Sequence, residues 1–597
     1  MIDLTKPLDL DDAGAAAFLK QLQGNILKSH GREHAVHILV RFHTGYRKTA
    51  RVWLALFANK YVTSAHKQRE DARLKDEQQQ LFAMLFLSAA GYRALGIAAD
   101  KIPHDGSTRF QQGMKASAVA LGDQPQQWSP PYNEEIHAII LLAHKVEESL
   151  QHEAAAIRRQ LRRFCELVQD EVGIRLPMNT EHFGYFDGIS QPLFIQQEIA
   201  REIQERGNQR WNPSANLDLV LVEEPGGKQT YGSFMVFRKL QQHVEQYNAA
   251  VNTLAAALGA PDGTAAQASA LIMGRSTEGI PLIKTSVINP QAKPNDFTYD
   301  VDPQGMICPL HAHIRKANPR NAANKDDQRI VRRGMPYQGE PSKNNGGNGW
   351  QTRDAVPPLE KGMLFMSFQA RLENFERIQR QLNDVDFPNA ATGIDPIAGW
   401  QNGQAVAQHW PQGDDVIDFT VGPLTTLKGG EYFFAPSLPT LQELASIDLA
   451  VLQLTPSQQQ RFQAAAERIL TNEDDALRVG DLWKQNRRID AVGLVGIQPD
   501  DFDAFYAYLV PLLPFLDANT VARSAGAIPT LTPDQQTRFQ RAFTALFDPE
   551  KLQTFAETWP NDPAAALAPF EVSTDEASLL YTYLGNFGIV LNLHMWL

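Results

Sequence analysis

The sequence predicts an α+β fold followed by a mainly helical extension. Two segments carry this prediction, because each reads as a strand that runs directly into a helix: 231–251 (YGSFMVFRKLQQHVEQYNAAV) and 362–382 (GMLFMSFQARLENFERIQRQL). Short strands interleaved with helices, without long parallel-sheet runs, are typical of helices packed on one face of an antiparallel sheet. From about residue 440 the sequence becomes rich in Ala, Gln and Leu and reads as helix.

The N-terminal third mixes the same two kinds of element. Residues 34–42 (HAVHILVRF) alternate and are β-rich, and 82–88 and 136–145 contain short apolar runs that predict buried strands. Residues 89–96 predict a helix that ends at Gly96. A longer helix with one apolar face is predicted from positions spaced three and four apart: Leu150, Ala154, Ile157, Leu161, Phe164 and Val168.

The helical extension holds a weak internal repeat. The stretch 454–463 (LTPSQQQRFQ) returns as 531–540 (LTPDQQTRFQ). In both copies a Thr is expected to cap a helix, with Pro at the first helical position. Two interpretations stay open: a duplicated partner-binding unit, or two similar helix starts in an all-helical appendage. We favour the second, because capping signals of this type recur by local physics alone.

The composition is that of a globular protein, and it excludes several classes of function. The chain has 597 residues, 43% of them hydrophobic, and a formal net charge of −12. This acidic balance argues against a nucleic-acid partner, which needs a basic surface, and suits a small-molecule enzyme. Two cysteines are too few for a disulfide scaffold or a four-thiolate metal site. No secretory signal and no apolar run of the ~18–20 residues that span a bilayer is visible, so we expect a cytoplasmic protein with no membrane partner.

One acidic residue, Asp187, stands among aromatic residues in the stretch HFGYFDGISQP (182–192). Asp-Gly is a common turn dipeptide, so a plain turn is the simplest interpretation. The alternative is a catalytic acid or base held in a dry pocket between aromatic rings. The stretch alone favours the turn.

A cationic region carries two histidines. The stretch CPLHAHIRKANPR (308–320) is followed by DQRIVRRGMPY (327–337), and His311 and His313 are two residues apart. On a strand or an extended loop the two side chains would share a face. A histidine pair can bind zinc, but no convincing third or fourth ligand stands nearby. The basic residues read as solvated charge rather than a nucleic-acid patch, because no aromatic residues are interleaved with them.

The segments GYFDGISQP, CPLHAHIRKANPR and RRGMPY, in that order, resemble the dye-decolorizing peroxidase family of haem enzymes. The flanks 22–42 and 427–437 agree, and the resemblance extends from about residue 20 to about residue 440. It implies a tandem pair of ferredoxin-like domains, with haem held mainly by the second. The two implied domains and the helical extension are 1–225, 226–440 and 441–597.

The resemblance implies haem b, one per chain, and assigns three residues to it. The family's iron ligand is the histidine of an A-H-I-R-K type motif, which falls on His313. On the other side of the iron the family uses the aspartate of GxxDG and the first arginine of R-x-G-[IM]-P-[YF], here Asp187 and Arg332. A carboxylate can carry the proton of hydrogen peroxide, and a guanidinium can stabilise charge on the departing oxygen.

Other residues are assigned from their places in the same segments. Glu373 is the candidate for a carboxylate that makes the imidazole of His313 electron-rich. Leu364 and Met366 are expected to form an apolar ceiling over the haem. Charge-assisted hydrogen bonds to the haem carboxylates are expected from Arg315, Asn318 and Arg320.

The implied function is a peroxidase that reduces hydrogen peroxide and oxidises organic donors, such as dyes and phenolics, by one-electron steps. Tyr337 is the candidate for electron transfer at the surface, the alternative being a packed tyrosine with a bonded hydroxyl. Two other hypotheses are a protein for haem storage, delivery or iron removal, and a non-enzymatic scaffold. Loss of Asp187 or Arg332 would abolish peroxidation but not storage. The extension is compatible with three roles: a cover over the haem domain, a homodimer contact, or a docking site for a partner.

Overall fold

A computed structural model describes residues 2–444, with gaps at 163, 208–210, 227–228, 260–262, 285–294, 321–328, 340–358, 401–406 and 414, and single residues or short stretches between 458 and 576. Contacts within the chain divide it into two units. The first comprises Met1–Thr44, Phe57–Arg158 and Cys165–Leu441, and the second comprises Gly45–Leu56, Arg159–Phe164 and Gln442–Leu597. None of the helices in the described residues is long and apolar enough to cross a membrane.

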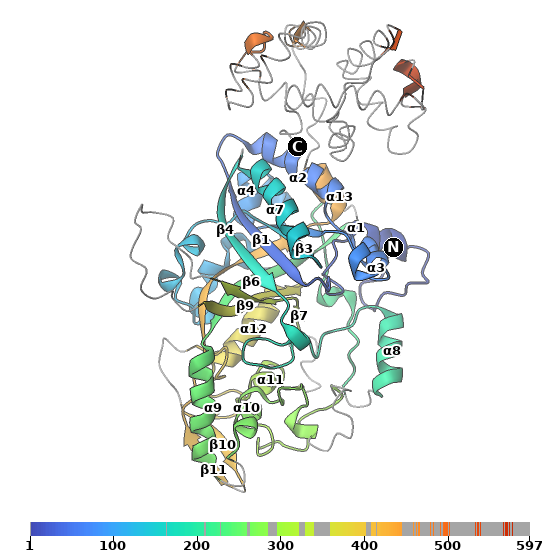
Figure 1. Cartoon of the computed structure of the whole chain (residues 1–597). Helices are drawn as coiled ribbons and strands as arrows, with labels where there is room; N and C mark the ends of the chain where they lie inside the picture. The colour runs from blue at the N-terminus through green and yellow to red at the C-terminus, as the bar shows by residue number, and fades with distance from the viewer. Residues whose placement is uncertain are drawn as a thin grey trace. The chain divides into compact units, whose positions relative to one another are not determined.

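The first unit is built on one antiparallel sheet (Figure 1). Within the described residues, the strands of this sheet follow the order β4-β1-β3-β2-β12-β6-β9-β7, with β5 beside β6 and β8 beside β9. The strands are β1 (His34–Phe42), β2 (Phe82–Leu87), β3 (Ala138–His144), β4 (Cys165–Ile174), β5 (Val222–Glu223), β6 (Tyr231–Gln242), β7 (Val331–Arg332), β8 (Met335–Gly339), β9 (Glu360–Gln369) and β12 (Thr425–Ala435). A separate hairpin pairs β10 (Gln408–Gln412) with β11 (Asp415–Phe419).

The sheet consists of two copies of the same strand order. In the N-terminal half, β1 lies between β4 and β3, and β2 pairs with β3. In the second half, β6 lies between β12 and β9, and β8 pairs with β9. Each half therefore has the β-α-β-β-α-β pattern of a ferredoxin-like fold, which confirms the predicted fold class. The halves share one sheet through the pairing of Leu87 in β2 with Phe434 in β12, so the boundary at 225/226 stays a prediction.

The helices are mostly short. Their bounds are α1 (Ala15–Gln21), α2 (Arg47–Lys60), α3 (Ala65–Asp71), α4 (Ala89–Ala94), α5 (Arg109–Gln112), α6 (Ala118–Leu121), α7 (Glu147–Leu161), α8 (Gln196–Arg206), α9 (Val244–Leu258), α10 (Ala265–Met273), α11 (His313–Ala317), α12 (Leu372–Asn383) and α13 (Leu438–Glu443). Both predicted strand-then-helix segments are present, as β6 with α9 and β9 with α12.

One predicted helix is too long. The apolar spacing extended it to Val168, but α7 ends at Leu161 and the following residues form β4. Phe164 and Val168 continue the helical spacing by coincidence, because Phe164 lies in the connection and Val168 lies in β4. A periodic pattern alone does not show where a helix stops.

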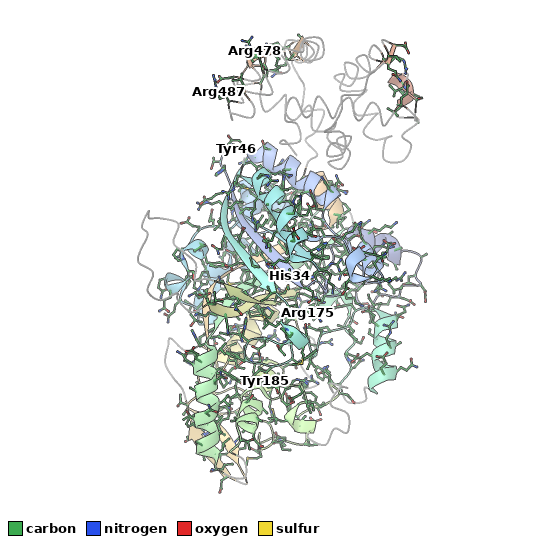
Figure 2. The ribbon with its side chains drawn as sticks, viewed as in Figure 1. His34, Tyr46, Arg175, Tyr185, Arg478 and Arg487 are labelled. Atoms are coloured by element: carbon green, nitrogen blue, oxygen red, sulfur yellow. The ribbon has the colours of Figure 1, made fainter. Side chains whose placement is uncertain are left out.

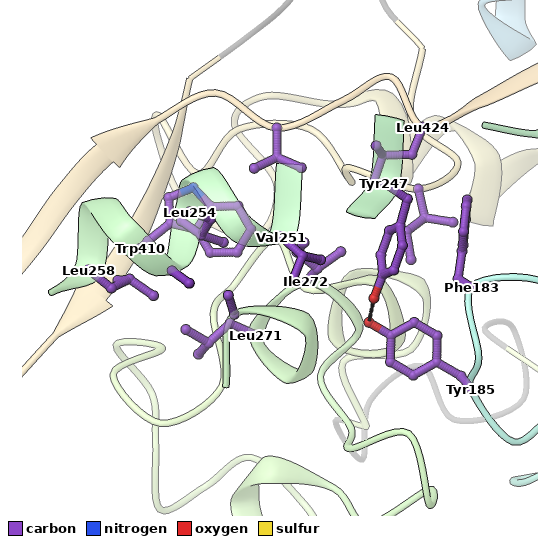
Figure 3. Packing of buried hydrophobic residues seen from close by; sticks show 14 residues of the cluster. Phe183, Tyr185, Tyr247, Val251, Leu254, Leu258, Leu271, Ile272, Trp410 and Leu424 are labelled. Atoms are coloured by element: carbon purple, nitrogen blue, oxygen red, sulfur yellow. Dashed lines mark hydrogen bonds between the residues drawn. The ribbon is translucent and has the colours of Figure 1, made fainter. Parts of the chain in front are cut away.

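A buried cluster in the second half anchors the segment before Asp187 (Figure 3). Phe183 stacks on Tyr247 of α9 with 4.4 Å between ring centroids, and the hydroxyls of Tyr185 and Tyr247 are 2.6 Å apart. Trp410 of β10 is fully buried at the other end of the same cluster. The aromatic residues around Asp187 in the sequence therefore serve as packing anchors for its loop.

The described residues of the extension are largely helical, and they extend the repeat beyond the helix starts. In the first copy the side chains of Gln458 and Arg461 donate to Asp501, at 2.8 and 2.6 Å. In the second copy the equivalent Gln535 and Arg538 donate to the carboxylate of Glu576, and both Arg538 bonds measure 2.7 Å. A shared capping signal does not explain this shared clamp, so the duplicated-unit interpretation gains support; partner binding stays a prediction.

Candidate functional site

A cavity of about 300 Å³ lies in the second half of the sheet unit. The cavity is surrounded by alternate residues of β6 and β9, the inner face of α12, the start of α11 and the loop that carries Asp187. Its lining includes Asp187, Arg275, His313, Arg320, Arg332 and Phe365. The three residues assigned from separate motifs, Asp187, His313 and Arg332, thus meet at one cavity.

His313 opens α11 and is the cavity's histidine. Its Nδ1 donates to Oδ2 of Asp395 at 2.5 Å, and the Asp395 side chain is fully buried. The other oxygen, Oδ1, accepts the backbone N–H of Ile397 at 2.7 Å. A carboxylate fixed at both oxygens holds the ring orientation and leaves Nε2 as the nitrogen available to a metal.

Glu373 does not have the role predicted for it. Its half-exposed carboxylate pairs with Arg109 at 3.4 Å and with Arg380 at 3.6 Å, on the outside of α12. The carboxylate beside His313 is Asp395, in the stretch TGIDPIAGW. The sequence contains no signal for this pairing, because a lone Asp before Pro reads as a turn and the two residues are far apart along the chain.

His311 points away from the cavity. The expectation of a shared face is wrong, because the chain turns into α11 at His313 instead of staying extended. The His311 ring is buried and packs edge-on against Trp410 with 4.4 Å between centroids. Burial lowers the pKa of His311 to about 3, so the ring is neutral at ordinary pH. His311 is a neighbour of the site and not part of it.

Asp187 is both the turn residue and a cavity residue. Its N–H donates to the carbonyl of Asn179 at 2.8 Å, and its own carbonyl accepts Nδ2 of Asn179 at 2.8 Å. Oδ1 accepts the N–H of Gly188 at 2.7 Å, and Gly188 has a φ of 82°, as a tight turn requires. The two interpretations of the Asp-Gly pair are therefore compatible.

Arg332 reaches the cavity from β7, where it pairs with Ser367 of β9. Its Nη2 donates to the carbonyl of Ile189 at 2.7 Å, and its backbone N–H donates to Oε1 of Gln191 at 3.1 Å. Both contacts tie Arg332 to the loop that follows Asp187. The next residue, Arg333, is buried and donates instead to the carbonyls of the segment Asn25–Ile26.

Two of the three predicted carboxylate partners line the cavity. Asn318 and Arg320 do, but Arg315 is turned away, because its guanidinium donates to Asp302 and to the carbonyl of Cys308. Arg275, which has no motif to mark it, lines the same region. Burial lowers the pKa of Arg275 to about 10 and that of Arg320 to about 9, which leaves both cationic at neutral pH.

The predicted ceiling is displaced by one residue. Leu364 and Met366 are buried on the opposite face of β9, where Leu364 approaches Gly173 of β4. Met363 and Phe365 line the cavity instead. Because side chains alternate along a strand, an error of one residue in register exchanges the two faces.

Tyr337 is not a surface residue. It is 4% exposed, its hydroxyl donates to Glu360 at 2.7 Å, and the ammonium of Lys239 lies 4.8 Å from its ring centroid. The alternative of a packed tyrosine with a bonded hydroxyl describes this geometry, so a donor too bulky for the cavity does not meet this ring directly.

Comparison with known proteins gives consistent matches over this part of the chain. The model of the DyP dimeric alpha+beta barrel domain matches residues 22–187, and that of the Dyp-type peroxidase C-terminal domain matches residues 206–391. Multifunctional dye peroxidase DyP2 of Amycolatopsis sp. is 33% identical over 476 residues, which cover 74% of this chain and all of that protein. Dye-decolorizing peroxidase msp1 of Mycetinis scorodonius is 30% identical over 405 residues, 60% of this chain and 75% of that protein.

Solved structures agree with the sequence relatives. The crystal structure of the DyP-type peroxidase AnaPX of Anabaena sp. has a TM-score of 0.65 at 34% identity and covers 73% of this chain and 97% of its own. Its near-complete coverage and the paired domain matches account for both halves of the sheet unit. This chain therefore belongs to the dye-decolorizing peroxidase family and is a haem-dependent peroxidase.

Proposed function

We propose that this chain reduces hydrogen peroxide with Asp187 and Arg332 as its catalytic pair, while His313 binds the iron of one haem b per chain. A dye or phenolic donor is oxidised in two one-electron steps. The observation that carries the proposal is the convergence on one cavity of His313, with Nδ1 held by Asp395, and of Asp187 and Arg332.

The cavity residues fit a haem group by their chemistry. Leu240, Phe365 and Phe375 offer apolar walls to a flat macrocycle, and His313 offers a nitrogen. The two buried guanidinium groups of Arg275 and Arg320 suit the carboxylates that haem carries. When bound, haem would supply the iron and the redox chemistry that couples reduction of hydrogen peroxide to oxidation of the donor.

The two catalytic residues act on the proton and the charge of the peroxide. Asp187 accepts the proton from one peroxide oxygen and returns it to the other, which leaves as water. Arg332 stabilises the negative charge that develops on the departing oxygen, and its guanidinium stays protonated throughout. Its bond to the carbonyl of Ile189 keeps it beside the Asp187 loop, so both groups face one substrate molecule.

The alternative function is haem storage, delivery or iron removal with incidental peroxidation. It requires only His313 and the cavity. Two further details belong to the proposal: dyes as donors, which the names of the relatives support, and a homodimer, which the name of the matched N-terminal domain supports.

The test is to load the full chain with haem and follow its absorption spectrum after one equivalent of hydrogen peroxide. We expect a Soret band that shifts within seconds and returns when a dye is added. Asp187→Asn should keep the band and slow its shift by about 10²- to 10⁴-fold. An Asp187→Asn variant that reacts at the rate of the parent chain would contradict the catalytic role of Asp187. Haem binding without any spectral change after hydrogen peroxide would favour the haem carrier, and a chain without any Soret band would contradict His313 as the iron ligand.

A further inference from the structure

Two successive residues next to the Asp187 loop have a left-handed backbone. Met178 has a φ of 56° and Asn179 a φ of 58°. This conformation is uncommon outside glycine, and Asn tolerates it better than Met. Met178 is 82% exposed, so its packing does not offset the strain. Such strain persists only where surrounding contacts enforce it, and it gathers at functional sites.

The contacts that enforce it come from the side chain of Asn179. Its Nδ2 donates to the Asp187 carbonyl at 2.8 Å, and its Oδ1 accepts Nε of Arg175 at 3.1 Å. Arg175 directly follows β4, where Figure 2 labels it beside His34, and its backbone N–H donates to the Glu33 carbonyl at 2.8 Å. The amide of Asn179 thus joins the end of β4, the first strand in the sheet order, to the main chain of Asp187.

The Asp187 main chain is held at both of its polar atoms by the same residue. The N–H of Asp187 donates to the carbonyl of Asn179, and the carbonyl of Asp187 accepts the Asn179 amide, both at 2.8 Å. The carboxylate makes no bond to Asn179 and accepts only the adjacent Gly188 N–H within the described residues. The backbone is fixed while the reactive group stays accessible to the cavity.

The interior of the loop is fixed by a second device. The partly buried carboxylate of Glu181 accepts the N–H groups of Phe183 and Tyr185, each at 2.9 Å, and the side-chain amide of Gln242. This carboxylate holds the aromatic part of the loop, but it has no bond to Asp187. The preceding residue, Phe186, donates its N–H to the carbonyl of Thr277 at 3.0 Å, whereas the main-chain N–H and carbonyl of Asp187 itself are both held by the Asn179 bracket at the neck of the loop.

We infer that Asn179 is a positioning residue for Asp187, and that the left-handed Met178–Asn179 turn exists to present it. The inference rests on the proposed function, in which Asp187 carries the peroxide proton. Asn combines the three required properties: a side-chain donor for the Asp187 carbonyl, an acceptor for Arg175, and tolerance of a positive φ. Gly offers only the last, and Asp replaces the donor with an oxygen that faces another oxygen.

The test compares Asn179→Gly and Asn179→Asp with the parent chain, all loaded with haem. Asn179→Gly keeps the backbone conformation and loses both side-chain bonds, and Asn179→Asp keeps the acceptor for Arg175 and loses the donor. We expect a normal Soret band in both and a rate constant for hydrogen peroxide lowered by about 10- to 100-fold, because small misplacements of a catalytic group have effects of this size. The KM for the dye should not change. The control is Gln229→Gly, an exposed residue with a φ of 56° outside the cavity, which should react normally.

Two further measurements separate positioning from a general structural role. Hydrogen exchange at the Asp187 amide, measured without haem, should be faster in Asn179→Gly, because the bracket that protects it is opened. In an Asp187→Asn background, Asn179→Gly should lower the peroxide rate no further. An equal loss in that background, or unchanged exchange, would overturn the inference.

The outcome also separates this inference from the function on which it rests. If Asp187→Asn is slow and both Asn179 variants are fast, Asn179 does not position Asp187 and the proposed function stands. If Asp187→Asn is itself fast, the catalytic role of Asp187 fails and the inference fails with it. If Asn179→Gly does not fold, the Asn179→Asp variant decides the matter by the same rate and exchange measurements.

Discussion

The two sides of the cavity hold their key residues in opposite ways. On one side His313 is fixed through its side chain, by a bond from Nδ1 to a fully buried carboxylate of Asp395. On the other side Asp187 is fixed through its main chain, by the bracket from Asn179. A metal ligand needs one ring orientation and one tautomer, whereas a proton carrier needs carboxylate oxygens that are not already occupied. The contrast agrees with the proposed roles, in which His313 binds the iron and Asp187 carries the proton.

The largest expected effect is the loss of haem binding when the imidazole ring of His313 is removed. His313→Ala removes the only histidine that lines the cavity in the described residues, so we expect no stable haem binding and no activity. Absorption spectra after haem addition and gel filtration would measure the loss. His311→Gln is the matched control, since His311 packs on Trp410 outside the cavity, and it should retain haem. Equal haem content in both variants would contradict the assignment.

The next effect concerns the reactive side. Arg332→Leu should keep haem and fold while the rate constant for hydrogen peroxide falls by about 10²- to 10³-fold, the usual effect of losing one charge-stabilising donor. Arg333→Leu should instead keep the rate constant for hydrogen peroxide and lower the free energy of unfolding. The reason is that Arg333 donates to buried carbonyls of Asn25 and Ile26. Each carbonyl left without a donor costs about 1–3 kcal/mol of stability. Stopped-flow spectra and thermal unfolding of the two variants should therefore diverge.

A smaller effect is expected when the imidazole ring of His313 is kept and its carboxylate partner, Asp395, is changed. Asp395→Asn keeps an acceptor for Nδ1 but removes the negative charge, so haem should remain bound and its reduction potential should become more positive. We expect the peroxide rate to fall by about 10- to 100-fold, as is typical for such supporting carboxylates. Spectroelectrochemical titration would measure the potential. Glu373→Gln, on the outside of α12, should leave both values unchanged.

The smallest expected effect is a pH dependence of stability that comes from Glu181, in the loop that carries Asp187. Burial raises the pKa of Glu181 above its usual 4.5, and the nearby Asp187 raises it further. A raised carboxyl pKa in the folded state means that its contribution to stability is full below 4.5 and is lost as pH rises through the folded pKa. Glu181→Gln should therefore match the parent chain near pH 4 and become relatively more stable at higher pH. Parallel curves of Tm against pH for the two proteins would contradict this.

Motif residues were predictable from the sequence because each motif is local. The GxxDG, A-H-I-R-K and R-x-G-M-P-Y stretches place Asp187, His313 and Arg332, and all three line the cavity. The strand-then-helix segments predicted the α+β class for a similar reason, since periodicity is a local property. Both successes depend on residues that are close together along the chain.

The residues that escaped prediction depend on distant contacts or on register. Asp395 meets His313 only through tertiary structure, and Arg275 belongs to no motif. Leu364 and Met366 were wrongly expected to line the cavity. Which face of β9 each side chain occupies depends on the pairing of β9 with β6 and β8, and the sequence does not reveal this pairing. Sequence spacing also did not distinguish the end of α7 from the start of β4.

The position of β12 in the sheet has a consequence for how the protein is made. β12 is the last strand of the first unit along the chain, yet it lies between β2 and β6, near the middle of the sheet. A chain emerging from the ribosome therefore presents β2 and β6 as two unprotected strand edges until residues 425–435 appear. Thr425 of this strand also lines the cavity. A chain that stops before β12 therefore lacks both the strand that joins β2 to β6 and the part of the cavity wall that Thr425 forms.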